Sequence, residues 1–131
     1  MKVLVVIEKA KDGFFSCYME NETFDFALFG HGKTAAEAKS DLLLAYEEIK
    51  TMKLEKKEQI PDLVFDFKYD MQSFFDYFDF INVTKLAKSM DINPSLLRQY
   101  RTGATKASQK QYEKLERKVH SIWQELSAAM F

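Results

Sequence analysis

The sequence predicts an α+β protein in two parts: a small β-β-β-α-β sheet domain over residues 1–70 and an all-α domain over residues 71–131. Three observations predict this division. Apolar residues alternate with polar ones in much of the first half, as in strands, and recur every three or four residues in the second, as in helices. A helix-turn-helix pattern, NVTKLAKSMDINPSLLRQYRTG, spans residues 82–103. The charge also changes sign between the halves.

Four strands are predicted in the first domain. Lys2–Lys9 holds five consecutive apolar residues, a pattern typical of a central strand covered on both faces. The other three segments alternate and are separated by turn signals such as Lys11-Asp12-Gly13 and Asn21-Glu22. They are Phe14–Met19, Phe24–Phe29 and Leu63–Tyr69.

One helix is predicted between the third and fourth strands. Thr34 followed by Glu37 forms a capping-box pattern at its start. Its apolar stripe consists of Ala35, Ala38, Leu42, Ala45, Ile49 and Met52. A helical crossover can place the fourth strand beside the first and parallel to it.

Residues 82–103 favour two short helices joined by a tight turn. Asn93 is a good N-cap, Pro94 suits the first helical position, and Gly103 supplies a stop. Asp91 stands where many such motifs carry glycine. The apolar contacts between the helices would come from Leu86, Met90, Ile92, Leu97 and Tyr100. A unit of this kind is sized to place its second helix in a DNA major groove.

Two further helices are predicted. Met71–Phe78 is short and aromatic and could belong to either domain. Ser108 with Gln111 opens a last helix, whose apolar side consists of Tyr112, Leu115, Val119, Ile122, Trp123, Leu126 and Met130. This stripe exceeds what a helix-turn-helix can cover, so we expect a homo-oligomer, a dimer or a tetramer, held by this helix.

The charge distribution favours a nucleic-acid partner for the second part. Residues 1–81 hold 10 Lys and Arg against 16 Asp and Glu, whereas residues 82–131 hold 9 against 4. Such a basic excess can neutralise phosphates. Cys17 is the single cysteine, no apolar run is long enough to span a membrane, and the five-residue apolar run near the amino terminus is shorter than we expect of a signal peptide. We therefore expect a cytoplasmic protein with no membrane partner.

The candidate DNA contacts lie in and around the second helix of the motif. Arg98 and Gln99 suit base readout, because Arg pairs with guanine and Gln with adenine in bidentate fashion. The candidates for backbone contacts are Thr84, Lys85, Ser95, Arg101 and Lys106. The alternative interpretation is a helical hairpin that fills a core, with a solvated lysine-rich face.

No cluster of catalytic or metal-ligating residues is predicted. A two-metal-ion nuclease site needs carboxylates that converge on two divalent ions, and the spacing does not group Glu8, Asp41, Glu48 and Asp66. His31 and His120 lack neighbouring ligands. We expect no enzymatic activity, no metal and no cofactor, and we expect Cys17 to be a buried small apolar residue.

Two motifs make the chain resemble the HicB-type antitoxins that carry a carboxy-terminal helix-turn-helix. They are Val5-Val6-Ile7-Glu8-Lys9 running through Lys11-Asp12-Gly13 into Phe14-Phe15, and Gly30-His31-Gly32-Lys33-Thr34 followed by Glu37-Ala38. The resemblance implies a partially degraded ribonuclease-H-like fold over residues 1–70 and a homodimeric DNA-binding module after it. It also implies a small basic HicA-type ribonuclease toxin as partner, bound at residues that no motif identifies.

The expected function is that of an antitoxin that neutralises a HicA-type toxin and represses its own operon by binding double-stranded operator DNA. One alternative is a stand-alone helix-turn-helix transcription regulator whose first domain senses a small ligand. The other is an active nuclease, which would cleave in the presence of Mg²⁺ or Mn²⁺.

Overall fold

The computed structural model describes residues 1–20 and 24–131, so the turn expected at Asn21-Glu22 lies outside the described residues. The chain divides into two compact units, a first unit, Met1–Phe78, and a second unit, Asp79–Phe131. The described residues form one four-stranded sheet and five helices, which confirms the α+β class. The division falls after Phe78 rather than after residue 70, and helix α2 (Met71–Tyr77) therefore belongs to the sheet unit.

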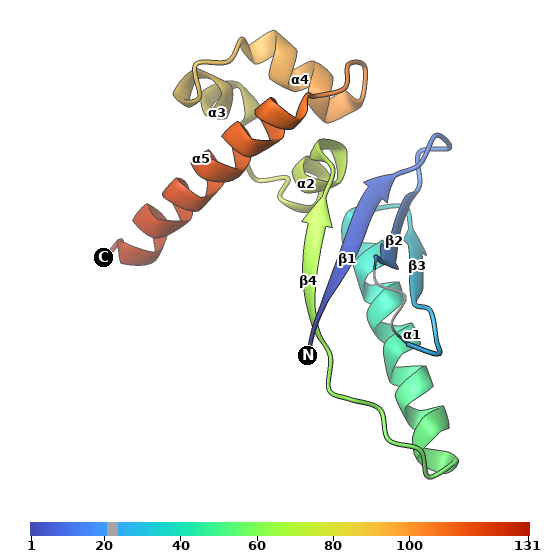
Figure 1. Cartoon of the computed structure of the whole chain (residues 1–131). Coiled ribbons are helices and arrows are strands. Elements are labelled where there is room, and N and C mark those ends of the chain that lie inside the picture. Colours follow the sequence, from blue (N-terminus) through green and yellow to red (C-terminus); the bar gives the residue numbers. More distant parts are fainter. Residues whose placement is uncertain (21–23) are drawn as a thin grey trace. The chain divides into compact units, whose positions relative to one another are not determined.

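The sheet of the first unit has the strand order β3-β2-β1-β4 (Figure 1). Strand β1 (Lys2–Lys9) pairs antiparallel with β2 (Phe15–Met19) and parallel with β4 (Val64–Tyr69). The connection from β3 (Phe29–Gly32) to β4 passes through helix α1 (Ala35–Glu55). The predicted helical crossover, with the fourth strand parallel to the first, is therefore confirmed.

Helix α1 packs on one face of this sheet (Figure 1) and buries the alternate β1 residues Val3, Val5 and Ile7. The predicted stripe is correct through Ile49, since Ala45 and Ile49 pack half-buried against the core. Tyr46 also enters the core, whereas Met52 is 48% exposed. The Tyr46 hydroxyl donates to the carbonyl of Pro61 and accepts from the amide of Leu63, so it fastens α1 to the segment that enters β4.

The opposite face of the sheet is less well covered, and the expectation that β1 is covered on both faces is wrong for the described first unit. Leu4 and Val6 lie on that face and are only half-buried, and Val64 beside them on β4 is 57% exposed. A five-residue apolar run is compatible with a central strand that has one buried face and one half-buried face. The run alone does not distinguish these cases.

The third strand is shorter and later than predicted, because Phe29–Gly32 pairs with β2 and Phe24–Leu28 does not. The alternation was real, since Phe24, Phe26 and Leu28 all turn toward the core, but that segment has no strand partner among the described residues. Pairing begins where glycines face α1. A Cβ atom at Gly30 would overlap the carbonyl oxygen of Ala38, and one at Gly32 would overlap the Cβ of Glu37.

Helix α2 is bonded into the first unit. The Asp76 carboxylate accepts a 2.7 Å hydrogen bond from the backbone amide of Ala35, at the start of α1. The ring of Tyr69, at the end of β4, packs against the rings of Phe74, Tyr77 and Phe78. These contacts explain why the aromatic helix belongs with the sheet.

The second unit contains helices α3 (Val83–Ser89), α4 (Pro94–Thr102) and α5 (Gln109–Ala128). The predicted limits of α4 are confirmed: the Asn93 side chain accepts from the Ser95 amide, and Gly103 adopts φ 83° after the last turn. Asp91 has φ 53°, the left-handed conformation for which glycine is common in such turns. The core of the unit consists of Val83, Leu86, Ala87, Met90, Ile92, Leu97, Tyr100 and Leu115.

Candidate nucleic-acid interface

The surface of α3 and α4, which we call the α3–α4 surface, carries the residues predicted to contact DNA. Leu97 and Tyr100 turn one side of α4 into the core, so the opposite side faces solvent. Thr84 is half-buried, and the other six predicted contacts are exposed: Lys85, Ser95, Arg98, Gln99, Arg101 and Lys106. None of the seven side chains is buried.

The structure joins two of these residues. The Arg98 guanidinium donates a 2.9 Å hydrogen bond from Nη1 to Oγ1 of Thr84, which links the middle of α4 to the first turn of α3. An Arg side chain has five N–H donors, so four remain free of this bond to meet a base edge or a phosphate. The bond restricts where the guanidinium can point, and such restriction lowers the entropy lost on binding.

Gln99 is held by the segment after α4. Its Oε1 accepts a 2.9 Å hydrogen bond from the Thr105 hydroxyl, and its backbone carbonyl accepts bonds from the Thr102 hydroxyl and the Thr105 amide. The side-chain amide group keeps both of its N–H donors. A bidentate contact to adenine also needs Oε1 as acceptor, so that contact must share this oxygen with Thr105 or displace it.

Sequence reasoning missed Thr102. It follows Ser95 by seven residues, Arg98 by four and Gln99 by three, and these are the spacings that place residues on one side of a helix. Arg101 follows the buried Leu97 by four and so lies at the border of the exposed side. The three- and four-residue spacing within α4 was the available signal for Thr102.

The segment 82–112, which contains α3, α4 and the start of α5, is strongly basic. Between residues 82 and 112, Asp91 is the single acidic residue, against the six basic residues Lys85, Lys88, Arg98, Arg101, Lys106 and Lys110. Within the described chain, the charged groups of Lys85, Arg101 and Lys106 form no ion pair. No neighbouring carboxylate therefore neutralises these three charges, and they can interact with phosphates.

The four carboxylates considered for a nuclease site lie on opposite sides of the sheet. Glu8 and Asp66 are exposed on β1 and β4, on the face turned away from α1, whereas Asp41 and Glu48 belong to α1 itself. They cannot converge on one pair of metal ions. Among the described residues, no three His, Cys, Asp or Glu side chains gather closely enough to hold a metal ion.

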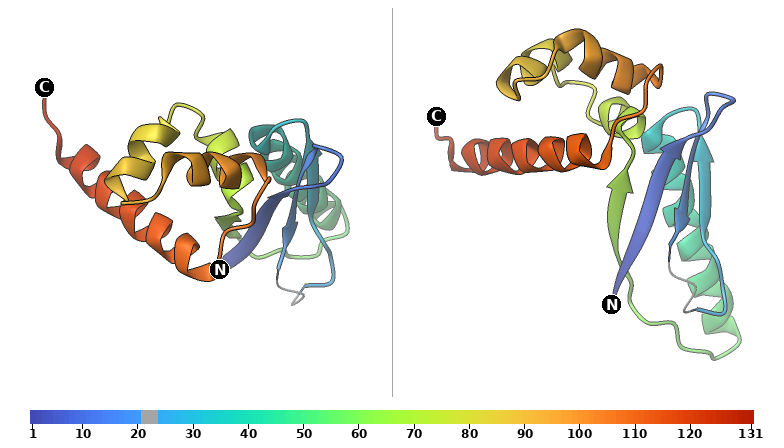
Figure 2. Two further views of the ribbon diagram at one scale, coloured as in Figure 1. Left: turned by 90° about the horizontal axis from the view of Figure 1, so that it is seen from above. Right: turned by 45° about the horizontal axis from the view of Figure 1, so that its top comes forward.

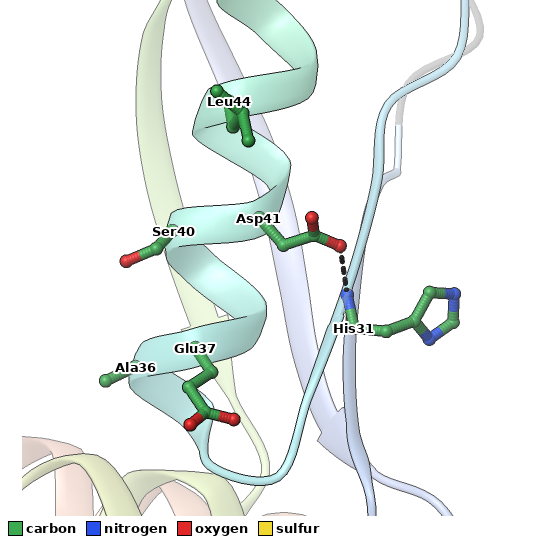
Figure 3. Close-up of a pocket in the computed structure, with 6 residues that line it drawn as sticks. All are labelled: His31, Ala36, Glu37, Ser40, Asp41 and Leu44. Atoms are coloured by element: carbon green, nitrogen blue, oxygen red, sulfur yellow. Dashed lines mark hydrogen bonds between the residues drawn. The ribbon is translucent and has the colours of Figure 1, made fainter.

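An open depression of about 500 Å³ lies along α1 beside β3. Its two carboxylates already bind backbone amides: Asp41 accepts from His31 at 2.9 Å, and Glu37 accepts from Lys33 at 2.7 Å. Figure 3 shows that the imidazole of His31 turns away from Asp41. The two hydrogen bonds therefore fasten β3 and the residue after it to α1. The depression does not bring the imidazole of His31 and the two carboxylates together as a catalytic site would.

Cys17 is a buried residue of β2 and lies opposite Gly30 of β3. Its thiol donates to the Ala38 carbonyl at 3.0 Å. Burial, together with the nearby charge of Asp41, raises the pKa of Cys17 to about 12 although the backbone of Gly30 opposes the shift. A thiol held in its protonated form is a poor nucleophile, so the residue packs as the small apolar side chain that was predicted.

No protein-family model, curated protein or solved structure matches this chain. None of the helices in the described part of the chain is long and apolar enough to cross a membrane.

Proposed function

We propose that this protein is a transcription repressor whose α3–α4 surface acts as a helix-turn-helix and binds double-stranded operator DNA. One observation carries the proposal: α4 is capped at both ends, packed by Leu97 and Tyr100, and turns a row of polar and basic side chains to solvent. Polar side chains of this length are not needed for burial, and a rigid helix of this kind fits the major groove.

The residues divide by the contact that each would make. Arg98 and Gln99 would read base edges, with Ser95 and Thr102 on the same side of α4. Lys85, Arg101 and Lys106 would bind phosphates on either side of the groove, where contacts set affinity rather than sequence preference. Thr84 would hold the Arg98 guanidinium through the 2.9 Å bond between them.

We further propose that the repressor is the antitoxin of a type II toxin-antitoxin pair, with a HicA-type ribonuclease toxin bound by the first unit. The resemblance of the two sheet-domain motifs to HicB-type antitoxins supports this role. Charge supports it as well, since residues 1–78 hold 10 Lys and Arg against 15 Asp and Glu, which suits a small basic partner. The exposed apolar side chains Phe29, Leu44 and Met52 offer contact area on that unit.

DNA binding is tested by fluorescence anisotropy with the DNA upstream of the chain's own gene. Arg98→Ala should weaken binding by ~1–3 kcal/mol and relax preference at one base pair, while Lys106→Ala should weaken all sequences alike and lower the salt slope. Arg117→Ala removes an exposed arginine from α5 and serves as the matched control. Equal affinity of Arg98→Ala and the wild type would refute the assignment.

The toxin-binding role has its own test. The chain is co-expressed with the product of the adjacent gene and purified through a tag on the chain. We expect a small basic protein to co-purify and its ribonuclease activity to be suppressed in the complex. An adjacent product that does not bind, or that stays active when bound, would remove the antitoxin role and leave the repressor role standing.

A further inference from the structure

Helix α5 carries an apolar row that is covered only in part in the single chain. Tyr112, Leu115, Val119, Ile122 and Leu126 follow one another by three, four, three and four residues, the spacing of a coiled-coil seam. Of the residues of α5, all of which are described, Leu115 alone is buried. The rest of the row is half-buried or exposed.

The uncovered part of the row lies in the carboxyl-terminal half of the helix. Trp123 and Leu126 are each 66% exposed, and Met130 beyond the helix is 92% exposed. Within the second unit, the carboxyl-terminal end of α5 extends past α3 and α4 in the views of Figures 1 and 2. Large apolar side chains gathered on one side of a projecting helix indicate an interface with a partner.

We infer that the partner is a second copy of this chain and that two α5 helices pair antiparallel through this row. In the register that matches every layer, Val119 lies opposite Ile122 of the partner copy, and Leu115 lies opposite Leu126 of the partner copy. The same pairs form twice, since a two-fold axis relates the helices. Leu126, which is 66% exposed in the single chain, would then be covered at the edge of the core that already buries Leu115.

Charge complementarity selects the antiparallel direction. Lys118 and Glu125 flank the row on the same side, one heptad apart. Antiparallel helices bring like flanking positions together, so each Lys118 meets a Glu125 of the other copy and two ion pairs form. In a parallel pair, Lys118 would face Trp123 and Glu125 would face Met130, and neither carboxylate–ammonium pair would form.

The direction also sets the separation of the two α5 starts, which follow the DNA-binding surfaces in the chain, and its bearing on DNA rests on the proposed function. In this register the two Gln109 residues, where α5 begins, are separated by 23 helical steps, roughly 34 Å at 1.5 Å per residue. That is the order of the 34–36 Å between successive major grooves on one side of the duplex. A parallel pair would place both helix starts about 8–10 Å apart, at one end.

Analytical ultracentrifugation of the full chain tests the pairing. The wild type should be dimeric, and Leu126→Asp should be monomeric with an unchanged circular dichroism spectrum, because Leu126 is mostly exposed in the single chain. Lys118→Glu should weaken the dimer about tenfold, since it replaces two attractions with two repulsions. The double variant Lys118→Glu with Glu125→Lys should regain the affinity of the wild-type dimer.

Arg117→Glu is the matched control, because it makes the same charge change at the adjacent position, on the outer side of the helix, away from the row. A monomeric wild type at micromolar concentration would overturn the inference, as would a loss of dimer in Arg117→Glu equal to that in Lys118→Glu. So would a double variant that stays as weak as the single one.

The direction is measured separately by spin labels on Gln109→Cys in a Cys17→Ser background. A label separation near 34 Å supports the antiparallel pair, and a separation below about 20 Å overturns it. Neither experiment uses DNA. A dimer with the predicted geometry that fails to bind the operator would therefore sink the proposed function and leave this inference intact.

Discussion

The hydrogen bond between Arg98 and Thr84 provides a sharp test of the proposal that the α3–α4 surface binds DNA through a positioned Arg98. Thr84→Val keeps the shape of the side chain and removes the acceptor for Nη1 of Arg98. A hydrogen bond of this kind contributes a net ~1 kcal/mol, so the variant should bind operator DNA about fivefold more weakly. Thr84→Ser retains the hydroxyl and should restore most of the affinity.

A double-mutant cycle separates the two roles that Thr84 could have. If Thr84 acts by positioning Arg98, then Thr84→Val should cost nothing further in an Arg98→Ala background, and the coupling energy should equal about 1 kcal/mol. Thr51→Val is the control, because Thr51 lies on α1 and its hydroxyl donates to the carbonyl of Glu47. Anisotropy titrations of the four proteins at one salt concentration provide the measurement. Equal losses in both backgrounds would mean that Thr84 contacts DNA directly and would refute the positioning argument.

Three further predictions concern the first unit. Gly30→Ala should destabilise it by about 3 kcal/mol in urea unfolding, because the added Cβ meets backbone atoms of α1; Gly13→Ala, where the surroundings are open, should cost only the ~1 kcal/mol of its φ of 87°. Ser73→Ala should raise the free energy of unfolding of the first unit by about 1 kcal/mol. The reason is that the Ser73 hydroxyl is fully buried and finds no hydrogen-bond partner among the described residues. Burial and the neighbouring Tyr77 raise the pKa of Tyr69 from 10.0 to about 12, so an ultraviolet-monitored titration should show a late tyrosine phase that Tyr69→Phe removes. The stability that this raised pKa contributes should be complete below pH 10 and lost as the pH rises toward 12; a titration that Tyr69→Phe leaves unchanged at high pH would contradict it.

The sequence predicted those elements whose signals are local. Asn93, Pro94 and Gly103 mark the limits of α4 because each residue suits one backbone position, and no distant contact changes that preference. The crossover to β4 was predictable for a different reason. A strand, a helix and a further strand leave few ways to build one sheet, and the parallel neighbour of β1 is among them.

The sequence failed where distant parts of the chain decide the outcome. Phe24–Leu28 alternates as a strand does, yet the pairing with β2 begins only at Phe29, and Gly30 and Gly32 in the paired segment allow α1 to approach the backbone closely. Likewise, Tyr46 lies in the core and its hydroxyl meets Pro61 and Leu63, contacts that the helical spacing within α1 does not indicate. Periodicity reports which side of an element is apolar and says nothing of which partner covers it.

The candidate site illustrates the same division at the scale of single side chains. Helical spacing places Arg98 and Gln99 on the exposed side of α4, and it also indicates Thr102. It does not reveal that Thr84 binds the first of them or that Thr105 binds the second. These two bonds give the pair unequal freedom: Arg98 keeps four N–H donors while its direction is fixed, whereas Gln99 must share its acceptor. Specificity at the Arg98 position should therefore be the stronger of the two, since its partner bond leaves intact the donors that guanine requires.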